Sequence, residues 1–161
     1  MGLPGSGKSF FAERLAEALG AKYLSSDRER NRIGKRGRYS PDDKLTVYQH
    51  LVDLAKTAMK NEQTVVVDAT FHLQQMRDLF ADLAAEEGAA VFYFNITAEY
   101  ELIRERLQKP RNESQADFSV HQVIKDEFEP FPMKVITLES KKDNIASLLE
   151  NALKLIEHGK E

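Results

Sequence analysis

The sequence predicts an α/β fold of three layers, in which a parallel sheet lies between helices on both of its faces. Short apolar runs rich in β-branched or aromatic residues alternate with amphipathic helices of ten or more residues, which is the pattern of βαβ units. The chain has 161 residues, of which 42% are hydrophobic and 30% charged, and these are values of one globular domain. We therefore expect a single domain over residues 1–161.

The predicted elements follow one another along the whole chain. Helices are expected at about residues 10–19, 41–61, 72–87, 97–108, 119–129 and 143–157, with a short helix after residue 27. Strands are expected at residues 21–25, 63–68, 89–96 and 134–138. Ser119 and Gln122 have the spacing of a capping box, so Ser119 is expected to begin its helix. Ligands of such sheets bind beyond the carboxyl ends of the strands.

The first nine residues contain a phosphate-binding motif. Residues 2–9 read Gly-Leu-Pro-Gly-Ser-Gly-Lys-Ser and match G-x-x-x-x-G-K-[ST], the P-loop or Walker A motif. The glycines let backbone N–H groups turn toward an anion, and the positive end of the following helix dipole points at the same place. Lys8 is expected to reach the β- and γ-phosphates and Ser9 to ligate Mg²⁺. The expected contacts of ATP are Gly2, Pro4, Gly5, Ser6, Gly7, Lys8 and Ser9.

Two acidic residues follow predicted strands at the same edge of the sheet. Asp68 ends the strand at residues 63–68, which is the position of a Walker B acid that helps to hold Mg²⁺. Asp27 follows the strand at residues 21–25. It can be read as a catalytic residue or as the N-cap of the turn after it.

With these landmarks in this order, the chain resembles the small P-loop kinases, a group that includes polynucleotide 5′-hydroxyl kinases, zeta toxins and predicted kinases of the AAA-domain type. The landmarks after the P-loop are Ser26-Asp27-x-x-Arg30, Val67-Asp68-Ala69-Thr70, Glu105-Arg106-Leu107 with Arg111 downstream, and Ser114-x-Ala-Asp117 before a helix ending Glu127-Phe128-Glu129-Pro130. The resemblance covers residues from Gly2 to about Phe131.

The resemblance implies the P-loop kinase fold, with the strand order 2-3-1-4-5 and a small lid at about residues 109–118. In that order the first strand leads into the P-loop and occupies the middle of the sheet. The sequence begins after this strand. The hypothesis is that the sequence is truncated or starts at an internal methionine, and that the complete gene product has a few apolar residues upstream.

The resemblance also implies roles for side chains around the acceptor. Asp27 would act as the general base for the acceptor hydroxyl, and Arg30 would hold the acceptor. Asp68, together with Thr70, would contact the acceptor, which is the alternative to its role toward Mg²⁺. Arg77 is a further candidate contact of the acceptor, or a surface arginine of its helix.

Arginines around residues 109–118 are implied to complete the site. Arg106 and Arg111 would bring positive charge to the transferring phosphoryl group when the lid closes over the phosphates. Arg104 is a weaker candidate, because it can instead pair with a helix acid such as Glu101.

Six basic residues between Arg28 and Arg38 form the strongest charge anomaly of the chain. They would either line the acceptor site, which favours a phosphorylated or nucleic-acid acceptor, or form a solvated loop whose charges are partly offset by Asp27 and Glu29. The net charge of −3 gives the whole protein no attraction to nucleic acid or to an anionic membrane. A nucleic-acid partner is therefore possible but not favoured, and no membrane partner is expected.

The sequence as a whole predicts an ATP-dependent kinase, with ATP and Mg²⁺ as cofactors, that transfers the γ-phosphate to a hydroxyl of a small-molecule or nucleotide-like acceptor. A polynucleotide 5′-hydroxyl kinase is one alternative. A nucleotide-binding regulator that hydrolyses ATP slowly is an alternative of another class. The chain contains no cysteine, which suits the reducing conditions of the cytoplasm.

Overall fold

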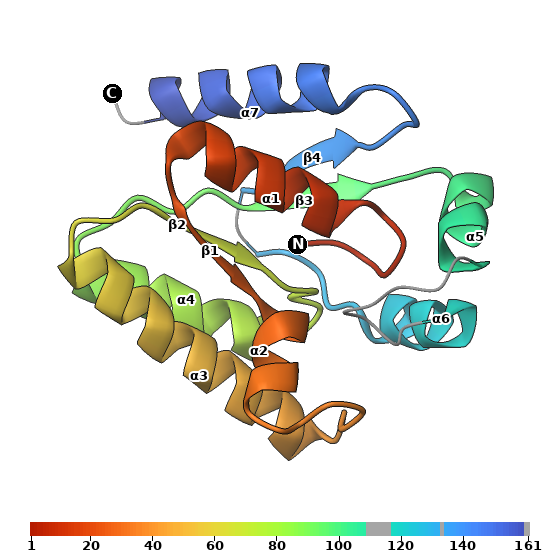
Figure 1. The fold of residues 1–161 in the computed structure, drawn as a ribbon, viewed down its shortest axis with the longest axis horizontal. Helices are drawn as coiled ribbons and strands as arrows, with labels where there is room; N and C mark the ends of the chain where they lie inside the picture. Colours follow the sequence, from red (N-terminus) through yellow and green to blue (C-terminus); the bar gives the residue numbers. More distant parts are fainter. Residues whose placement is uncertain (109–116, 133, 160–161) are drawn as a thin grey trace.

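The computed structural model describes residues 1–108, 117–132 and 134–159. Helices and strands alternate over this part of the chain (Figure 1). The helices are α1 (Lys8–Leu19), α2 (Ser26–Arg32), α3 (Pro41–Lys60), α4 (Gln74–Glu86), α5 (Tyr100–Gln108), α6 (Phe118–Glu127) and α7 (Ile145–His158). The strands are β1 (Lys22–Ser25), β2 (Val65–Asp68), β3 (Phe94–Thr97) and β4 (Ile136–Glu139).

The strands form two parallel pairs between layers of helices. In the pair of β1 and β2, Tyr23 is in register with Val66, and in the pair of β3 and β4, Phe94 is in register with Ile136. Helices α3 and α4 lie on one side of the strands and α1 and α7 on the other, while α5 and α6 lie at one end (Figure 1). The predicted α/β fold with parallel strands and helices on both faces is confirmed.

Met1 lies between the two strand pairs and is hydrogen-bonded to β3. Its α-amino group donates to the carbonyl of Phe94 at 2.7 Å, and the N–H of Ile96 donates to the carbonyl of Met1 at 2.9 Å. This is the hydrogen-bond pattern of a parallel ladder. On the other side, the N–H of Gly2 donates to the carbonyl of Thr70 at 3.4 Å. The residues that enter the P-loop therefore occupy the centre of the sheet, between β2 and β3.

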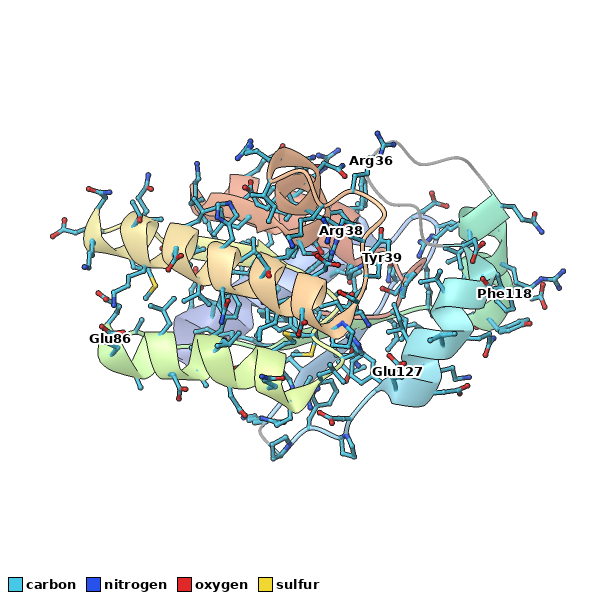
Figure 2. All side chains as sticks on the ribbon, turned by 90° about the horizontal axis from the view of Figure 1, so that it is seen from below. Arg36, Arg38, Tyr39, Glu86, Phe118 and Glu127 are labelled. Atoms are coloured by element: carbon cyan, nitrogen blue, oxygen red, sulfur yellow. The ribbon has the colours of Figure 1, made fainter. Side chains whose placement is uncertain are left out.

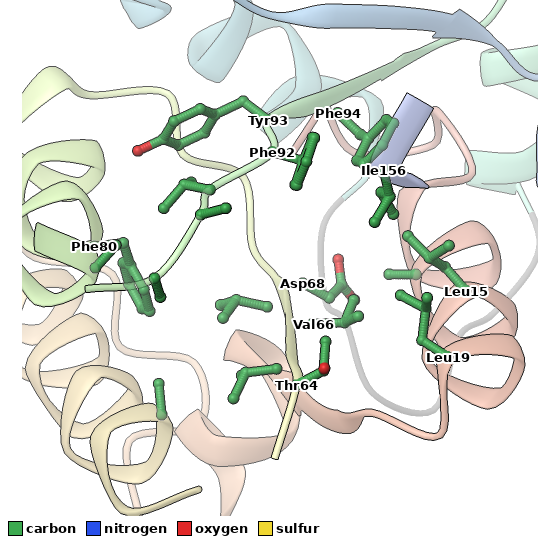
Figure 3. Close-up of a pocket in the computed structure, with 18 of the residues that line it drawn as sticks. Leu15, Leu19, Thr64, Val66, Asp68, Phe80, Phe92, Tyr93, Phe94 and Ile156 are labelled. Atoms are coloured by element: carbon green, nitrogen blue, oxygen red, sulfur yellow. The ribbon is translucent and has the colours of Figure 1, made fainter. Parts of the chain in front are cut away.

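A cavity of about 510 Å³ lies behind Met1, toward the amino ends of β2 and β3 (Figure 3). Its walls are mainly apolar and include Leu15, Val66, Phe80, Phe92 and Ile156. Burial there lowers the pKa of the Met1 α-amine to about 5. The cavity includes Lys8 and Asp68 among its lining residues, but the glycines of the P-loop lie outside it.

Local sequence signals explain where the helices begin, with one correction. Ser40 caps α3, because its hydroxyl accepts the N–H of Asp43 at 3.1 Å, and Pro41 occupies the first helical position, as predicted. The predicted capping box at Ser119 is wrong. The N-cap of helix α6 lies two residues earlier, where the carboxylate of Asp117 accepts the N–H of Val120 at 3.0 Å.

The predicted strand at residues 89–96 is also longer than the observed one. Strand β3 begins at Phe94, whose partner Ile136 is the first residue of β4. In the described structure the pairing with β4 starts at Phe94, and the residues before Phe94 border the cavity. Two apolar clusters form the core, one around Leu51 and Phe80 under α3 and α4, and one around Leu15 and Ile96 under α1 and α7.

Candidate functional site

The P-loop is curled tightly at its glycines. Gly2, Gly5 and Gly7 have φ angles of 143°, 83° and 95°, in the region that side chains disfavour. A Cβ atom on Gly5 would also lie 3.0 Å from the side chains of Ile103 and Leu107, so glycine is needed for the close packing of α5. The loop therefore takes the conformation that its glycines predict.

Helix α1 starts at the end of this loop with donors available for an anion. Gly7 stands at the N-cap, no side chain caps the helix, and its first turn contains no acidic residue. The first N–H groups of a helix have no partners within the helix. Lys8 is half-buried and Ser9 is exposed at this end. These residues fit a phosphate group, since the N–H groups, the ammonium and the helix dipole share one location.

The carbonyl groups on the outer side of the P-loop are held by side chains. Arg106 Nη1 donates to the carbonyls of Gly5 at 3.3 Å and Ser6 at 3.0 Å, and Arg106 Nη2 donates to Ser140 Oγ at 3.0 Å. His121 Nδ1 lies 2.8 Å from the carbonyl of Pro4. The predicted contact of Arg106 with the transferring phosphoryl group stays a prediction. The sequence analysis did not identify His121, and no local pattern marks it.

Asp68 is buried at the carboxyl end of β2 and has one unpartnered oxygen. The hydroxyl of Tyr23 donates to Asp68 Oδ2 at 2.8 Å, whereas Oδ1 is buried without a hydrogen-bond partner in the described structure. Burial and the charge of Asp68 raise the pKa of Tyr23. A buried carboxylate oxygen without a donor fits a cation or a hydroxyl group of a ligand.

The structure also bears on Mg²⁺. Within the described residues, no group of three or more His, Asp or Glu side chains could hold a metal ion by itself. Mg²⁺ commonly keeps several waters and binds through one or two protein oxygens together with phosphates. Ser9 and Asp68 fit this mode, which needs no larger cluster of ligands.

Asp27 and Arg30 lie together on α2. The alternative that Asp27 caps this turn is wrong, because Ser25 is the N-cap and its hydroxyl accepts the N–H of Arg28 at 3.4 Å. Asp27 stands in the first turn of α2. The pKa of Tyr39 is raised mainly by the burial of its own side chain and, to a smaller extent, by the negative charge of Asp27. The guanidinium of Arg30 lies 4.6 Å from the centre of the Tyr39 ring.

Arg30 is buried, and its hydrogen bonding is incomplete. Its exposed fraction is 6%, and Nη1 donates to the carbonyl of Arg38 at 2.5 Å. Its Nε has no hydrogen-bond partner in the described part of the chain. Arg30 therefore has a donor left for a ligand.

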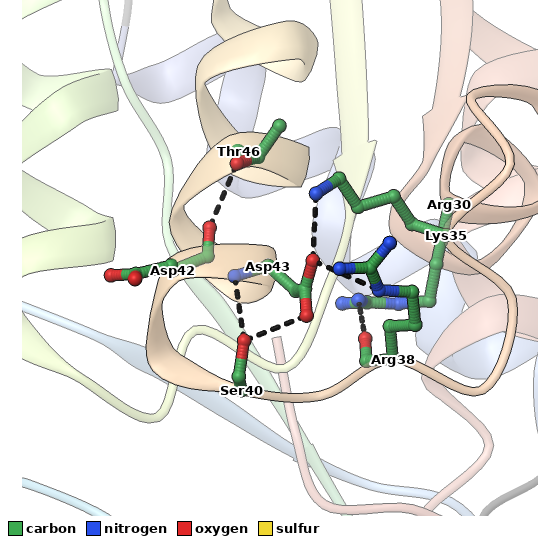
Figure 4. Close-up of polar contacts among 7 residues, drawn as sticks. All are labelled: Arg30, Lys35, Arg38, Ser40, Asp42, Asp43 and Thr46. Carbon is green, nitrogen blue, oxygen red and sulfur yellow. Dashed lines mark hydrogen bonds and ion pairs between the residues drawn. The ribbon is translucent and has the colours of Figure 1, made fainter.

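The loop between α2 and α3 carries Arg36, Arg38 and Tyr39 on the outside of the molecule (Figure 2). Asp43 at the start of α3 organises this loop, because its carboxylate lies 2.6 Å from Lys35 Nζ and 3.4 Å from Arg38 Nε (Figure 4). The hydrogen bond from Lys35 and the one from Ser40 lower the pKa of Asp43 to about 2.

Two more basic residues of this stretch are paired within the protein. Arg28 contacts Glu13 at 2.7 Å, and Arg32 contacts Glu29 at 2.7 Å. These pairs favour the second interpretation of the basic stretch, a loop whose charges are largely offset within the protein. The acids that offset them include Glu13 and Asp43, which the sequence analysis did not consider.

Arg77 is fully buried and ties separate segments together. Its guanidinium donates to the carbonyls of Phe71, Glu129 and Pro130 at 2.9–3.2 Å and to the Gln74 side chain. The alternative that Arg77 is a surface arginine of its helix is therefore wrong, because the side chain is buried and has acceptors within the protein. A contact of Arg77 with the acceptor stays a prediction.

The remaining predicted residues lie as follows. Thr70 is half-buried after β2, and its carbonyl accepts the N–H of Gly2. Arg104 is 3.7 Å from Glu101, so the predicted helix pair is confirmed. Arg111 and most of the predicted lid lie outside the described residues.

In the part of the chain that is described, no helix has the length and apolar character needed to cross a membrane.

Comparison with known proteins agrees with this arrangement. A model of the AAA_33 family, described as an AAA domain, matches residues 1–131. An uncharacterized protein of Mycobacterium tuberculosis is 30% identical over 118 residues, which are 66% of this chain. The match spans only 24% of that relative's length.

Solved structures of kinases share the fold. A sugar kinase from Janibacter has a TM-score of 0.74 at 20% identity, covering 98% of this chain and 91% of its own. An APS kinase of Mycobacterium tuberculosis, in complex with AMPPNP and APS, has a TM-score of 0.75 at 19% identity, covering 98% of this chain and 94% of its own.

Together, the parallel sheet and the P-loop at its edge define a domain with the P-loop kinase fold. The chain belongs to the AAA_33 family.

Proposed function

We propose that this protein is an ATP-dependent phosphotransferase with a small hydroxyl-bearing molecule as acceptor. The observation that supports it best is the unpartnered, buried Oδ1 of Asp68 at the same sheet edge as the P-loop. This places a carboxylate beside the phosphate-binding loop. A protein that only bound nucleotide through its P-loop would have no need of the additional polar groups on α2.

In the proposed reaction, the N–H groups of the P-loop and Lys8 bind the phosphates of ATP. Asp27 accepts the proton of the acceptor hydroxyl as that oxygen forms a bond to the γ-phosphorus. The bond from the γ-phosphorus to the β–γ bridging oxygen breaks, and ADP leaves. Arg30 holds the acceptor, with Thr70 and Arg77 as further candidate contacts. Ser9 and Asp68 would hold Mg²⁺, which when bound neutralises phosphate charge.

The acceptor is proposed to be a small molecule because Arg32, Lys35 and Arg38 pair with Glu29 and Asp43, which reduces the attraction of the basic stretch to a polyanion. Kinases of similar fold support this choice, since they include a sugar kinase, an APS kinase and a gluconokinase. The alternative is a polynucleotide 5′-hydroxyl acceptor, and the experiment must distinguish it from a small-molecule acceptor.

The test is to incubate the purified chain with γ-labelled ATP, Mg²⁺ and a panel of sugars, nucleosides and a 5′-hydroxyl oligonucleotide. Label is expected in a small acceptor. Lys8→Ala should abolish transfer and weaken ATP binding, whereas Asp27→Asn should lower transfer about a thousandfold and leave the Kd of ATP within about twofold. Asp53→Asn, on the exposed face of α3, is the matched control and should behave as the wild type.

Three outcomes contradict parts of this proposal. Label only in the oligonucleotide would replace the small acceptor by a polynucleotide. Release of ADP that depends on a protein partner, with no labelled acceptor, would indicate a nucleotide-binding regulator. A collapse of ATP affinity in Asp27→Asn would move Asp27 from the acceptor to the nucleotide.

A further inference from the structure

Side chains from two distant helices hold three consecutive carbonyl groups of the P-loop. His121 on α6 bonds the carbonyl of Pro4 at 2.8 Å, and Arg106 on α5 bonds the carbonyls of Gly5 and Ser6 at 3.3 and 3.0 Å. His121 and Arg106 are here called the carbonyl clamp. Both contacts join residues about one hundred or more positions apart in the chain.

The orientation of His121 is fixed by its surroundings. A carbonyl oxygen can only accept a hydrogen bond, so Nδ1 of His121 carries the proton in this contact. The side chain is only 3% exposed. Its ring is parallel to that of Phe118, with centroids 5.8 Å apart and an angle of 7°, and Phe118 meets the ring of Tyr100 edge-on at 5.5 Å. The donor is therefore held in place by packing from α5 and α6.

The clamp controls the side of the loop that faces phosphate. Each clamped carbonyl shares a rigid peptide plane with the N–H of the next residue. Fixing the three carbonyls therefore also fixes the direction of the N–H groups of Gly5, Ser6 and Gly7. The N–H of Ser6 donates to the carbonyl of Leu3 at 3.1 Å. Within the described structure, the N–H groups of Gly5 and Gly7 have no hydrogen-bond acceptor. A hydrogen bond to the carbonyl of a peptide group also strengthens its N–H as a donor.

We propose that His121 is a positioning residue of the nucleotide site, which acts through the Pro4 carbonyl to aim the Gly5 N–H at the phosphates. Arg106 acts in the same way on the next two peptide groups. Neither residue needs to touch the nucleotide for this role. This proposal rests on the proposed function of the P-loop as a nucleotide site. It does not depend on which molecule is the acceptor or on Asp27 as the general base.

The test uses three substitutions that separate the donor from the packing. In His121→Asn the amide nitrogen can occupy the position of Nδ1 and keep the hydrogen bond to Pro4. In His121→Gln the amide lies one bond farther out, near the position of Nε2, and in His121→Leu no donor remains. Kd values for ATP and for inorganic tripolyphosphate are measured by calorimetry on the full chain, and Tm is measured for each variant.

The expected result is a rise of about tenfold in both Kd values for His121→Leu and His121→Gln, because a buried carbonyl loses its donor and the loop loosens. His121→Asn should stay within about threefold of the wild type. If His121→Asn and His121→Gln weakened binding equally, and in proportion to a lower Tm, His121 would only pack in the core and would not act as a positioning residue. Wild-type Kd values in His121→Leu would overturn the clamp alone. A wild-type chain that binds neither ATP nor tripolyphosphate would overturn the proposed function together with the clamp.

Discussion

The two sides of the candidate site differ in how their buried polar groups are paired. On the nucleotide side, the carbonyls of Pro4, Gly5 and Ser6 accept hydrogen bonds from His121 and Arg106. On the proposed acceptor side, Arg30 Nε is buried without a hydrogen-bond partner in the described structure, and so is Oδ1 of Asp68, which the proposed reaction assigns to Mg²⁺. On the nucleotide side, the hydroxyl of Ser6 and the N–H groups of Gly5 and Gly7 also have no partner within the described residues.

This difference indicates that the carbonyl side of the P-loop is already held within the protein, whereas Asp68 and Arg30 keep polar atoms that a ligand could bind. A buried polar group without a partner costs free energy of folding, commonly about 1–3 kcal/mol. Such a cost is typical of sites where function is traded against stability. The comparison can be tested by changing one residue at a time on or near the acceptor side.

The largest effect is expected at Arg77, which is buried and well paired, in contrast to Arg30. Arg77→Leu removes a charged donor from three backbone carbonyls, so we expect a loss of about 3 kcal/mol or more in the free energy of unfolding. Arg77→Lys should lower the free energy of unfolding less than Arg77→Leu, because lysine keeps the positive charge. It should still lower it, because lysine lacks the planar guanidinium that reaches several acceptors. Urea unfolding followed by circular dichroism measures both.

The control for Arg77 is Arg104→Leu on the exposed surface of α5, where the partner Glu101 is 3.7 Å away. We expect a change within about 0.5 kcal/mol there. If Arg77→Leu were as mild as Arg104→Leu, the guanidinium would not hold these segments together. A role in binding the acceptor would then become the better explanation for a buried arginine at this position.

The sequence was sufficient to predict the features that depend on local patterns. The glycines and Lys8 identified the P-loop, the β-branched run placed Asp68 at a strand end, and helical spacing predicted the pair of Arg104 with Glu101. The contact of His121 with Pro4 spans 117 positions, and no periodicity or spacing can reveal it. The same holds for the acids that neutralise the basic loop.

A smaller effect is expected from the pH dependence of His72. Burial, followed by the nearby charge of Lys44, lowers the pKa of His72 to about 4, from an ordinary value of 6.5. The unfolded chain therefore binds a proton between pH 6.5 and 4 that the folded protein does not, so stability falls as the pH is lowered through this window. At about 1.4 kcal/mol for each pKa unit, less solvent screening, the loss is on the order of 2 kcal/mol.

His72→Leu tests this prediction, because neither ring nitrogen has a hydrogen-bond partner to lose. We expect the variant to show a flatter dependence of unfolding free energy on pH between 6.5 and 4, measured against the wild type at each pH. At pH 8 the His72 ring is neutral in both the folded and the unfolded protein. There the slope of unfolding free energy against pH should differ least between the variant and the wild type. Parallel curves across the window would show that His72 does not cause the acid sensitivity.

The smallest expected effect is the one that tests the comparison most directly. Asp68→Asn removes a buried negative charge whose Oδ1 has no partner, while the amide oxygen can still accept the hydrogen bond of Tyr23. We expect the free energy of unfolding of the ligand-free protein to rise by about 1 kcal/mol, a shift of roughly 2–4 °C in Tm, while phosphotransfer falls. Asp53→Asn on exposed α3 should change neither. A lower Tm in Asp68→Asn would mean that the carboxylate already stabilises the empty site, so Asp68 would not be a group kept unpaired for a ligand.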